Sequence, residues 1–298
     1  MALKDVKSWQ VGDVRITRIV EVASYPADIG MLLKDAGPEI FAPHKDWLSP
    51  HFITDDGQML MQWQAFAVQT PTRTMMIDTC IGNDRKLYFD VFNDMQTSFL
   101  EDLKASGIDP DDVDTVCCTH LHYDHVGWNT KLVDGKWVPT FPNARYLFDE
   151  TEYQEIRHLQ EIGDWHGGHL PDAIDPVMDA GLHQFISAPG YQVCDEVRME
   201  HTPGHTAGHC AIYIESQGER AVITGDLLHH PVQFAMPQRH GSFDHDPVKG
   251  AETRQAFVAQ NADGAIMVIG SHFSDPTAGW IIPDGDAWRF VTERPNAA

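Results

Sequence analysis

The stretch Thr119-His-Leu-His-Tyr-Asp-His-Val-Gly-Trp128 carries the strongest structural signal in this chain, with three histidines and one aspartate in six positions. Neutral imidazoles and carboxylates are the ligands that Zn²⁺ and similar divalent cations prefer. A lone His-x-His pair is usually a surface pair or a core histidine. Four such donors between an apolar run and a glycine are far more specific, and they predict a metal site.

The segment 113–119 before these histidines is short, apolar and rich in β-branched residues, which is typical of a buried strand. The histidines therefore fall where a strand enters a loop, and open α/β sheets bind ligands at that end of their strands. His120 and His122 are two positions apart, so an extended backbone can point both to one side. Asp124 and His125 lie beyond, where a turn can direct them toward a second metal.

Three later segments offer further ligands. The loop 201–209 is punctuated by proline and glycine and carries His205. The segments 221–226 and 265–272 are mostly apolar, which predicts buried strands that lead into Asp226 and His272. Each alone has an ordinary explanation, since an aspartate after a strand often caps the next helix. Together with the first motif they supply enough ligands for two adjacent metal ions.

The order H-x-H-x-D-H, H-T-P-G-H-T, G-D and S-H resembles the motifs of the metallo-β-lactamase superfamily, from the strand before Asp78 to about His272. The resemblance implies an α/β fold, a four-layer αββα sandwich, whereas periodicity alone indicates only mixed helix and strand. It further implies two divalent metal ions, with zinc the first choice and manganese, cobalt or iron the alternatives.

The resemblance also implies a role for each ligand, and it casts Asp78 as a residue that orients the site through hydrogen bonds. The first metal would be held by His120, His122 and His205, the second by Asp124, His125 and His272, with Asp226 bridging the two.

The chemistry that this ligand set implies is hydrolysis, in which water held between two metals attacks a carbonyl or phosphoryl centre. Asp124 would accept the proton of that water. The chain is similar to the branch of lactonases and methyl parathion hydrolase. Acyl-homoserine lactonases carry a tyrosine three residues after the bridging aspartate, but here that position is His229, and the run Gly225-Asp-x-x-His looks more like methyl parathion hydrolase.

The expected function is therefore hydrolysis of a small, apolar, ester-like substrate, with a lactone as first choice. An organophosphate triester or an aryl ester is the alternative. An iron-dependent sulfur dioxygenase of the same fold is a further alternative, and a binding protein with a structural metal is a third class. His229 has two readings: a catalytic group that stabilises the oxyanion or protonates the leaving group, or a residue that supports the metals from behind.

Two groups of residues are candidates for the walls of a substrate pocket. Trp165, His166 and His169 lie in a glycine-rich loop, and an opposite apolar wall would include Trp47, Trp63 and Phe66. The alternative for all of them is ordinary core or dimer packing.

The composition favours a small-molecule substrate as the binding partner. It leaves open whether the protein forms a homodimer. A formal net charge of −23 without a cluster of Lys and Arg disfavours nucleic acid. No apolar run approaches the roughly 18–20 residues that span a bilayer. The first residues lack the apolar core of a signal peptide, and the five cysteines are irregularly spaced. We therefore expect a cytoplasmic protein.

The chain is expected to form a single domain over residues 1–298, with a loop-rich arm at about 23–59 and a helical or loop insertion at about 149–185. Helices are predicted at 94–106 and 149–160. Another begins after Asp246, an N-cap followed by proline, and runs to about 260. Residues 191–200 are predicted to form a strand.

Overall fold

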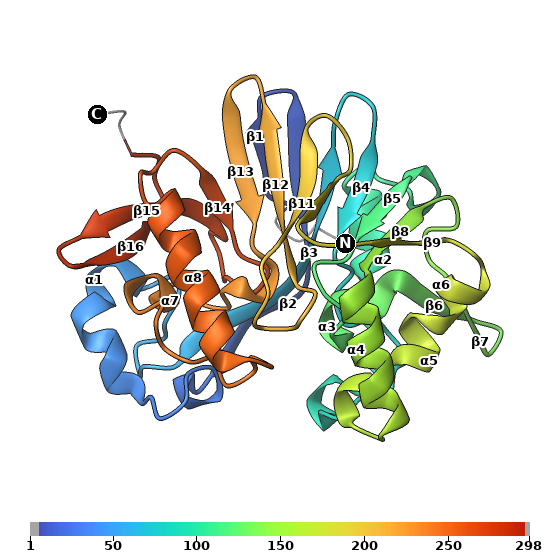
Figure 1. Ribbon diagram of the computed structural model, residues 1–298, viewed down its shortest axis with the longest axis horizontal. Helices are drawn as coiled ribbons and strands as arrows, with labels where there is room; N and C mark the ends of the chain where they lie inside the picture. The colour runs from blue at the N-terminus through green and yellow to red at the C-terminus, as the bar shows by residue number, and fades with distance from the viewer. Residues whose placement is uncertain (1–5, 296–298) are drawn as a thin grey trace.

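The computed structural model describes residues 6–295 and contains two seven-stranded sheets that face each other (Figure 1). In spatial order the first sheet consists of β1 (Ser8–Val11), β2 (Val14–Ala27), β3 (Met59–Gln69), β4 (Thr74–Ile77), β5 (Thr115–Cys117), β8 (Arg145–Asp149) and β9 (His183–Ile186). The second consists of β10 (Gly190–Gln192), β11 (Val197–His201), β12 (Cys210–Ser216), β13 (Glu219–Ile223), β14 (Met267–Ile269), β15 (Ala278–Asp284) and β16 (Ala287–Val291). A small ribbon pairs β6 (Thr130–Val133) with β7 (Lys136–Pro139).

Helices cover the outer face of each sheet, which makes four layers (Figure 1). On the first sheet lie α2 (Phe99–Ala105), α4 (Glu150–Glu161), α5 (Leu170–Ala173) and α6 (Asp175–Asp179). On the second lie α1 (Lys45–Leu48), α7 (Val232–Ala235) and α8 (Pro247–Asn261). The αββα sandwich that the motifs implied is confirmed.

The connections contain the short helix α3 (Tyr123–Val126) and several 3₁₀ turns. These turns are η1 (Ile29–Met31), η2 (Pro38–His44), η3 (Asp90–Phe92), η4 (Pro110–Asp112), η5 (Gly127–Asn129), η6 (Trp165–Gly167) and η7 (Gly225–Leu227).

Strand β3 shows why the sheets stack in this way. Phe66 and Val68 point into the core between the two sheets, while Ala65 and Ala67 point toward the helical layer. Successive side chains of a strand face opposite sides, so the apolar run 65–68 can bury both faces of the sheet. The small alanines let helices approach the outer face closely.

Two predicted elements differ from the structure. The helix predicted at 94–106 is shorter, since α2 begins only at Phe99, and Asp94 has a φ of +51°, which lies outside the α-helical region. The strand predicted at 191–200 is a hairpin, in which β10 pairs antiparallel with β11. By contrast, α8 begins as predicted: the Asp246 carboxylate accepts a hydrogen bond from the Lys249 amide.

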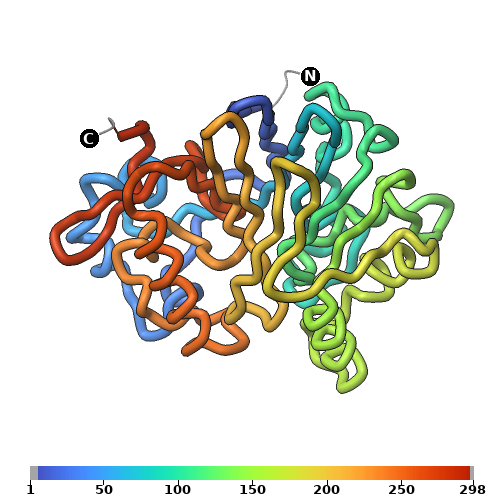
Figure 2. Tube along the Cα trace, turned by 45° about the horizontal axis from the view of Figure 1, so that its top comes forward, coloured from blue at the N-terminus to red at the C-terminus, as the bar shows by residue number. Residues whose placement is uncertain are grey.

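The arm at 23–59 continues β2 to Ala27 and then forms η1, η2 and α1, whose buried residues join the core of the second sheet. The segment 149–185 supplies α4, η6, α5 and α6. In Figure 2 the β1–β2 hairpin lies beside the β12–β13 hairpin, where the Asp13 amide bonds the Ser216 hydroxyl at 3.0 Å. The division into one domain with an arm and an insertion stays a prediction.

None of the helices at 6–295 is both long and apolar enough to cross a membrane. All five cysteines are free thiols, and four of them are buried.

Candidate metal centre

The ends of four strands bring the candidate ligands to one edge of the sandwich. Strand β4 leads into Asp78 and the parallel strand β5 leads toward His120. In the facing sheet β13 leads toward Asp226 and the parallel strand β14 toward His272. Parallel neighbours end at the same edge, so residues far apart in sequence converge there.

A first group of donors consists of His120, His122 and His205, all within one small space. His122 Nδ1 lies 3.1 Å from His120 Nε2 and 3.0 Å from His205 Nε2. Burial, followed by the neighbouring imidazoles, holds the pKa of His120 and of His122 well below the usual range. Neutral imidazoles with converging nitrogens offer the lone pairs that a cation requires.

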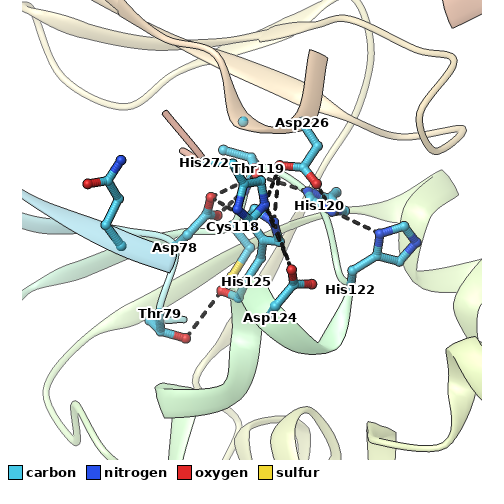
Figure 3. A network of polar contacts seen from close by, with 12 residues as sticks. Asp78, Thr79, Cys118, Thr119, His120, His122, Asp124, His125, Asp226 and His272 are labelled. Atoms are coloured by element: carbon cyan, nitrogen blue, oxygen red, sulfur yellow. Dashed lines mark hydrogen bonds and ion pairs between the residues drawn. The ribbon is translucent and has the colours of Figure 1, made fainter. Parts of the chain in front are cut away.

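A second group consists of Asp124, His125 and His272 (Figure 3). The Nε2 atoms of His125 and His272 lie 3.3 Å apart, and Asp124 Oδ2 lies 4.0 Å and 3.8 Å from them. The two imidazoles are buried and the carboxylate is half-buried. This mixture of nitrogen and oxygen donors also suits a divalent cation.

Asp226 lies between the groups and presents one oxygen to each. Its Oδ2 is 3.4 Å from His205 Nε2, whereas its Oδ1 is 3.2 Å from His125 Nε2 and 3.1 Å from His272 Nε2. Burial raises the pKa of Asp226, but the adjacent imidazoles outweigh it and hold that pKa well below its usual range. The carboxylate is therefore ionised.

The contacts at Asp226 Oδ1 are short but misaligned, so this buried atom has no hydrogen-bond partner among the described residues. An unpaired buried carboxylate oxygen is costly. An unpaired carboxylate oxygen with imidazole nitrogens 3.1–3.2 Å away fits a ligand that shares a cation with them. The residues present therefore fit a metal at either group.

Supporting hydrogen bonds hold the site from behind. Asp78 accepts from the Thr119 amide at 2.7 Å and from the Thr119 hydroxyl at 2.9 Å, and its Oδ2 is 2.9 Å from His125 Nδ1. The Asp226 amide donates to His209 Nε2 at 2.9 Å. Gly225 has a φ of +53°, and a Cβ there would lie 2.6 Å from that histidine, so only glycine fits.

His229 lies beside the candidate metal ligands. Its Nε2 is 3.1 Å from Asp226 Oδ2, and it forms a donor group with Asp226 and His205. Its Nδ1 is buried without a hydrogen-bond partner. Burial lowers the pKa of His229 and outweighs the opposing effect of Asp226, which favours the neutral form of the ring.

A pocket opens directly above the two donor groups. Its floor includes Asp124, Asp226 and His229. Most of its walls are apolar or aromatic: Tyr25, Ala27, Met31, Met59, Met61, Trp63, Phe89, Val91, Phe92, Tyr123, Trp165 and Phe243. Among the described residues that line it there is no lysine or arginine.

The predicted pocket walls are partly wrong. Trp165 and His166 line the pocket, and His166 Nδ1 lies 2.6 Å from an Asp164 oxygen. Phe66 instead faces the core between the sheets, and Trp47 packs against His44 within the arm. His169 is buried, with Nε2 2.7 Å from the Leu121 carbonyl oxygen, which takes it out of the pocket wall.

Two supporting residues have no signal in the sequence. Trp63 was expected only as an apolar wall, yet its Nε1–H donates to Asp124 at 2.9 Å. Glu152 accepts from the amides of Leu121 at 3.0 Å and Gly208 at 3.1 Å, and so joins the two histidine loops. A glutamate in the first turn of a helix is usually explained by its favourable interaction with the helix dipole. The sequence therefore gives no reason to expect that Glu152 links the two loops.

Comparisons with known proteins agree with this geometry. The family model described as the metallo-beta-lactamase superfamily matches residues 62–272. The N-acyl homoserine lactonase AiiA of Bacillus thuringiensis subsp. kurstaki is 30% identical over 121 residues, 41% of this chain and 40% of that protein. The chain thus spans less than half the length of the curated relative it matches.

Two solved structures are similar over nearly the whole chain. One is described as the hydrolase AbOPH in the beta lactamase superfamily, with a TM-score of 0.78, 25% identity and coverage of 98% of both chains. The other is AidC, a dizinc quorum-quenching lactonase, with a TM-score of 0.77, 19% identity and coverage of 98% of this chain and 99% of that one.

Proposed function

The chain belongs to the metallo-β-lactamase superfamily, and we propose that it is a metal-dependent hydrolase of an uncharged, ester-like substrate. One observation carries the proposal: the Asp226 carboxylate presents one oxygen to each of two groups of metal-binding side chains, at the floor of an apolar pocket. A structural metal needs neither a second donor group nor an open pocket above it.

The proposed cofactors are two divalent cations, with zinc the first choice and manganese, cobalt or iron the alternatives. His120, His122 and His205 would hold one, Asp124, His125 and His272 the other, and Asp226 would bind both. When bound, such cations lower the pKa of water and polarise a carbonyl or phosphoryl oxygen. The description of AidC as a dizinc lactonase supports this stoichiometry.

Two residues of the chain take part in the reaction in this proposal, one at the attacking water and one at the substrate. Asp124, held by Trp63, accepts the proton of the attacking water. His229 lines the pocket with its Nε2 3.1 Å from Asp226 Oδ2, and in the Nε2–H form this nitrogen donates a hydrogen bond to the oxygen on which negative charge develops. The protein needs no serine or cysteine nucleophile for this reaction.

The walls of the pocket favour a neutral substrate with an apolar part. The described residues that line the pocket include no Lys or Arg that could pair with a carboxylate or phosphate, and the formal net charge of −23 repels anions. A lactone is the first choice, which the name of AiiA supports. The description of AbOPH as a hydrolase leaves aryl esters and phosphotriesters as the second candidates.

A substrate panel tests the proposed function. The zinc-loaded protein should hydrolyse a neutral lactone, an aryl ester or a phosphotriester, and should turn over a carboxylated analogue far more slowly. Oxygen consumption with a thiol or persulfide substrate, by protein that holds one iron per chain, would favour the sulfur dioxygenase instead. Inactivity on the whole panel would contradict the hydrolase assignment.

The apolar walls predict a dependence on acyl-chain length. Each methylene that the pocket buries contributes about 0.8 kcal/mol, so kcat/KM for acylated lactones should rise about fourfold per methylene until the tail leaves the pocket. Phe92→Ala should flatten this rise, because Phe92 is a buried part of the wall. The matched control Ile162→Ala removes a 63% exposed residue outside the wall and should leave the series unchanged. A flat series in the wild type would refute an acyl site here.

A further inference from the structure

Three of the candidate histidine ligands have a partner for the ring nitrogen that faces away from the centre. His120 Nδ1 lies 3.1 Å from the Thr119 hydroxyl, His125 Nδ1 lies 2.9 Å from an Asp78 oxygen, and His272 Nδ1 lies 3.0 Å from the Gln62 carbonyl oxygen. Such outer hydrogen bonds fix the tautomer and the orientation of the ring. The corresponding atom of His205 is Nδ1, which is buried and has no hydrogen-bond partner.

Asp244 provides the missing partner. Its Oδ1 lies 3.6 Å from His205 Nδ1, and that oxygen is also buried without a hydrogen-bond partner. A donor and an acceptor, both buried and unpaired, thus face each other slightly beyond hydrogen-bond distance. The backbone holds them in register, since the His245 amide donates to the His205 carbonyl oxygen at 2.9 Å.

The surroundings of Asp244 are built to keep it ionised and in place. Its other oxygen accepts from Arg254 Nη2 at 2.8 Å and from the Gly241 amide at 3.1 Å, and both charged side chains are almost fully buried. A Cβ on Gly241 or Gly250 would approach that oxygen to 2.6 Å or 2.7 Å, so small residues leave room for the carboxylate. A buried ion pair is weak evidence for stability alone, so a role at the neighbouring histidine is the better explanation.

We propose that Asp244, paired with Arg254, is a positioning residue that fixes the Nδ1–H form of His205 and thereby sets the metal affinity of the His120–His122–His205 group. The proposal rests on the proposed function, because it presupposes that these histidines bind a cation. It assigns the segment before α8 a part in the metal centre, although neither Asp244 nor Arg254 lines the pocket itself.

Calorimetric titration of the metal-free protein with Zn²⁺, in which each binding step is resolved, tests whether Asp244 positions His205. Asp244→Asn keeps the size of the side chain and removes its charge, and one binding step should weaken by about 10–100-fold while the other is retained. The matched control Asp246→Asn lies two residues away and caps α8 without touching His205. It should bind both ions like the wild type.

Asp244→Asn leaves Arg254 buried without its counter-charge, so the double variant Asp244→Asn/Arg254→Gln is the second test. It removes both charges, and its metal-free form should unfold near the wild-type temperature while the same binding step stays weakened. Unchanged affinity in both variants would overturn the positioning role and leave the hydrolase proposal intact. If both Zn²⁺-binding steps are lost and the loss follows a lower Tm of the variant, Asp244 has a structural role and the positioning role is overturned. A wild type that binds no Zn²⁺ would overturn both proposals.

Discussion

Replacing Asp226 by alanine is expected to reduce hydrolysis by about 10³-fold or more and to lower the metal content. The carboxylate places one oxygen at each donor group, and the surrounding imidazoles already hold it in the ionised form. In the proposed two-metal centre its loss would remove a ligand from both positions, together with the negative charge that would let two cations lie close together. Metal catalysis contributes several kcal/mol to such reactions, which corresponds to about three powers of ten.

Asp226→Asn separates the charge from the volume of this side chain. It keeps the size and one oxygen, yet it should lose nearly as much activity as alanine if the bridging charge matters. Metal content, rates and the Tm of the metal-free protein should be measured on one preparation. Two bound metals and near-normal rates in either variant would refute the assignment of Asp226.

His229→Ala is expected to lower kcat for a lactone by about 10²-fold with little change in metal content. Loss of one hydrogen-bond donor to an oxyanion has this size. The ring lies at the pocket floor, with its Nε2 3.1 Å from Asp226 Oδ2. A phosphotriester with a good leaving group should suffer less, because its leaving oxygen needs little protonation. His229→Gln retains a donor and should recover part of the rate.

His230 offers a matched control for this experiment. It is the next residue and is equally buried, but its Nε2 lies 2.7 Å from the Phe52 carbonyl oxygen, away from the centre. His230→Ala should lower the Tm and leave kcat per folded molecule nearly unchanged. If His229→Ala instead loses metal and damages every substrate equally, that residue supports the metals and the catalytic reading is wrong.

The candidate ligands could be predicted from the sequence because each follows a recognisable local pattern. Buried strands end just before Asp78, His120, Asp226 and His272, and the ends of parallel neighbours meet in space. The start of the helix after Asp246 is equally predictable, since an N-cap and a first-turn proline are local sequence signals.

The walls of the pocket could not be predicted in the same way, because they come from segments that meet only in the folded chain. Trp63 and Phe66 were expected on one wall, but they are three positions apart on β3 and so face opposite sides of the sheet. The side chains of Tyr25, Phe92 and Phe243 reach the pocket from β2, from η3 and from the segment before α8. Asp244 and Arg254 likewise carry no sequence pattern that points to His205.

Removal and restoration of metal test the central claim most directly. Protein treated exhaustively with a chelator should remain folded, contain no metal by elemental analysis and hydrolyse none of its substrates. Activity should return on titration with Zn²⁺ and reach its plateau at two equivalents per chain, since two donor groups share Asp226. Full hydrolytic activity in folded protein whose metal has been shown to be absent would contradict the account.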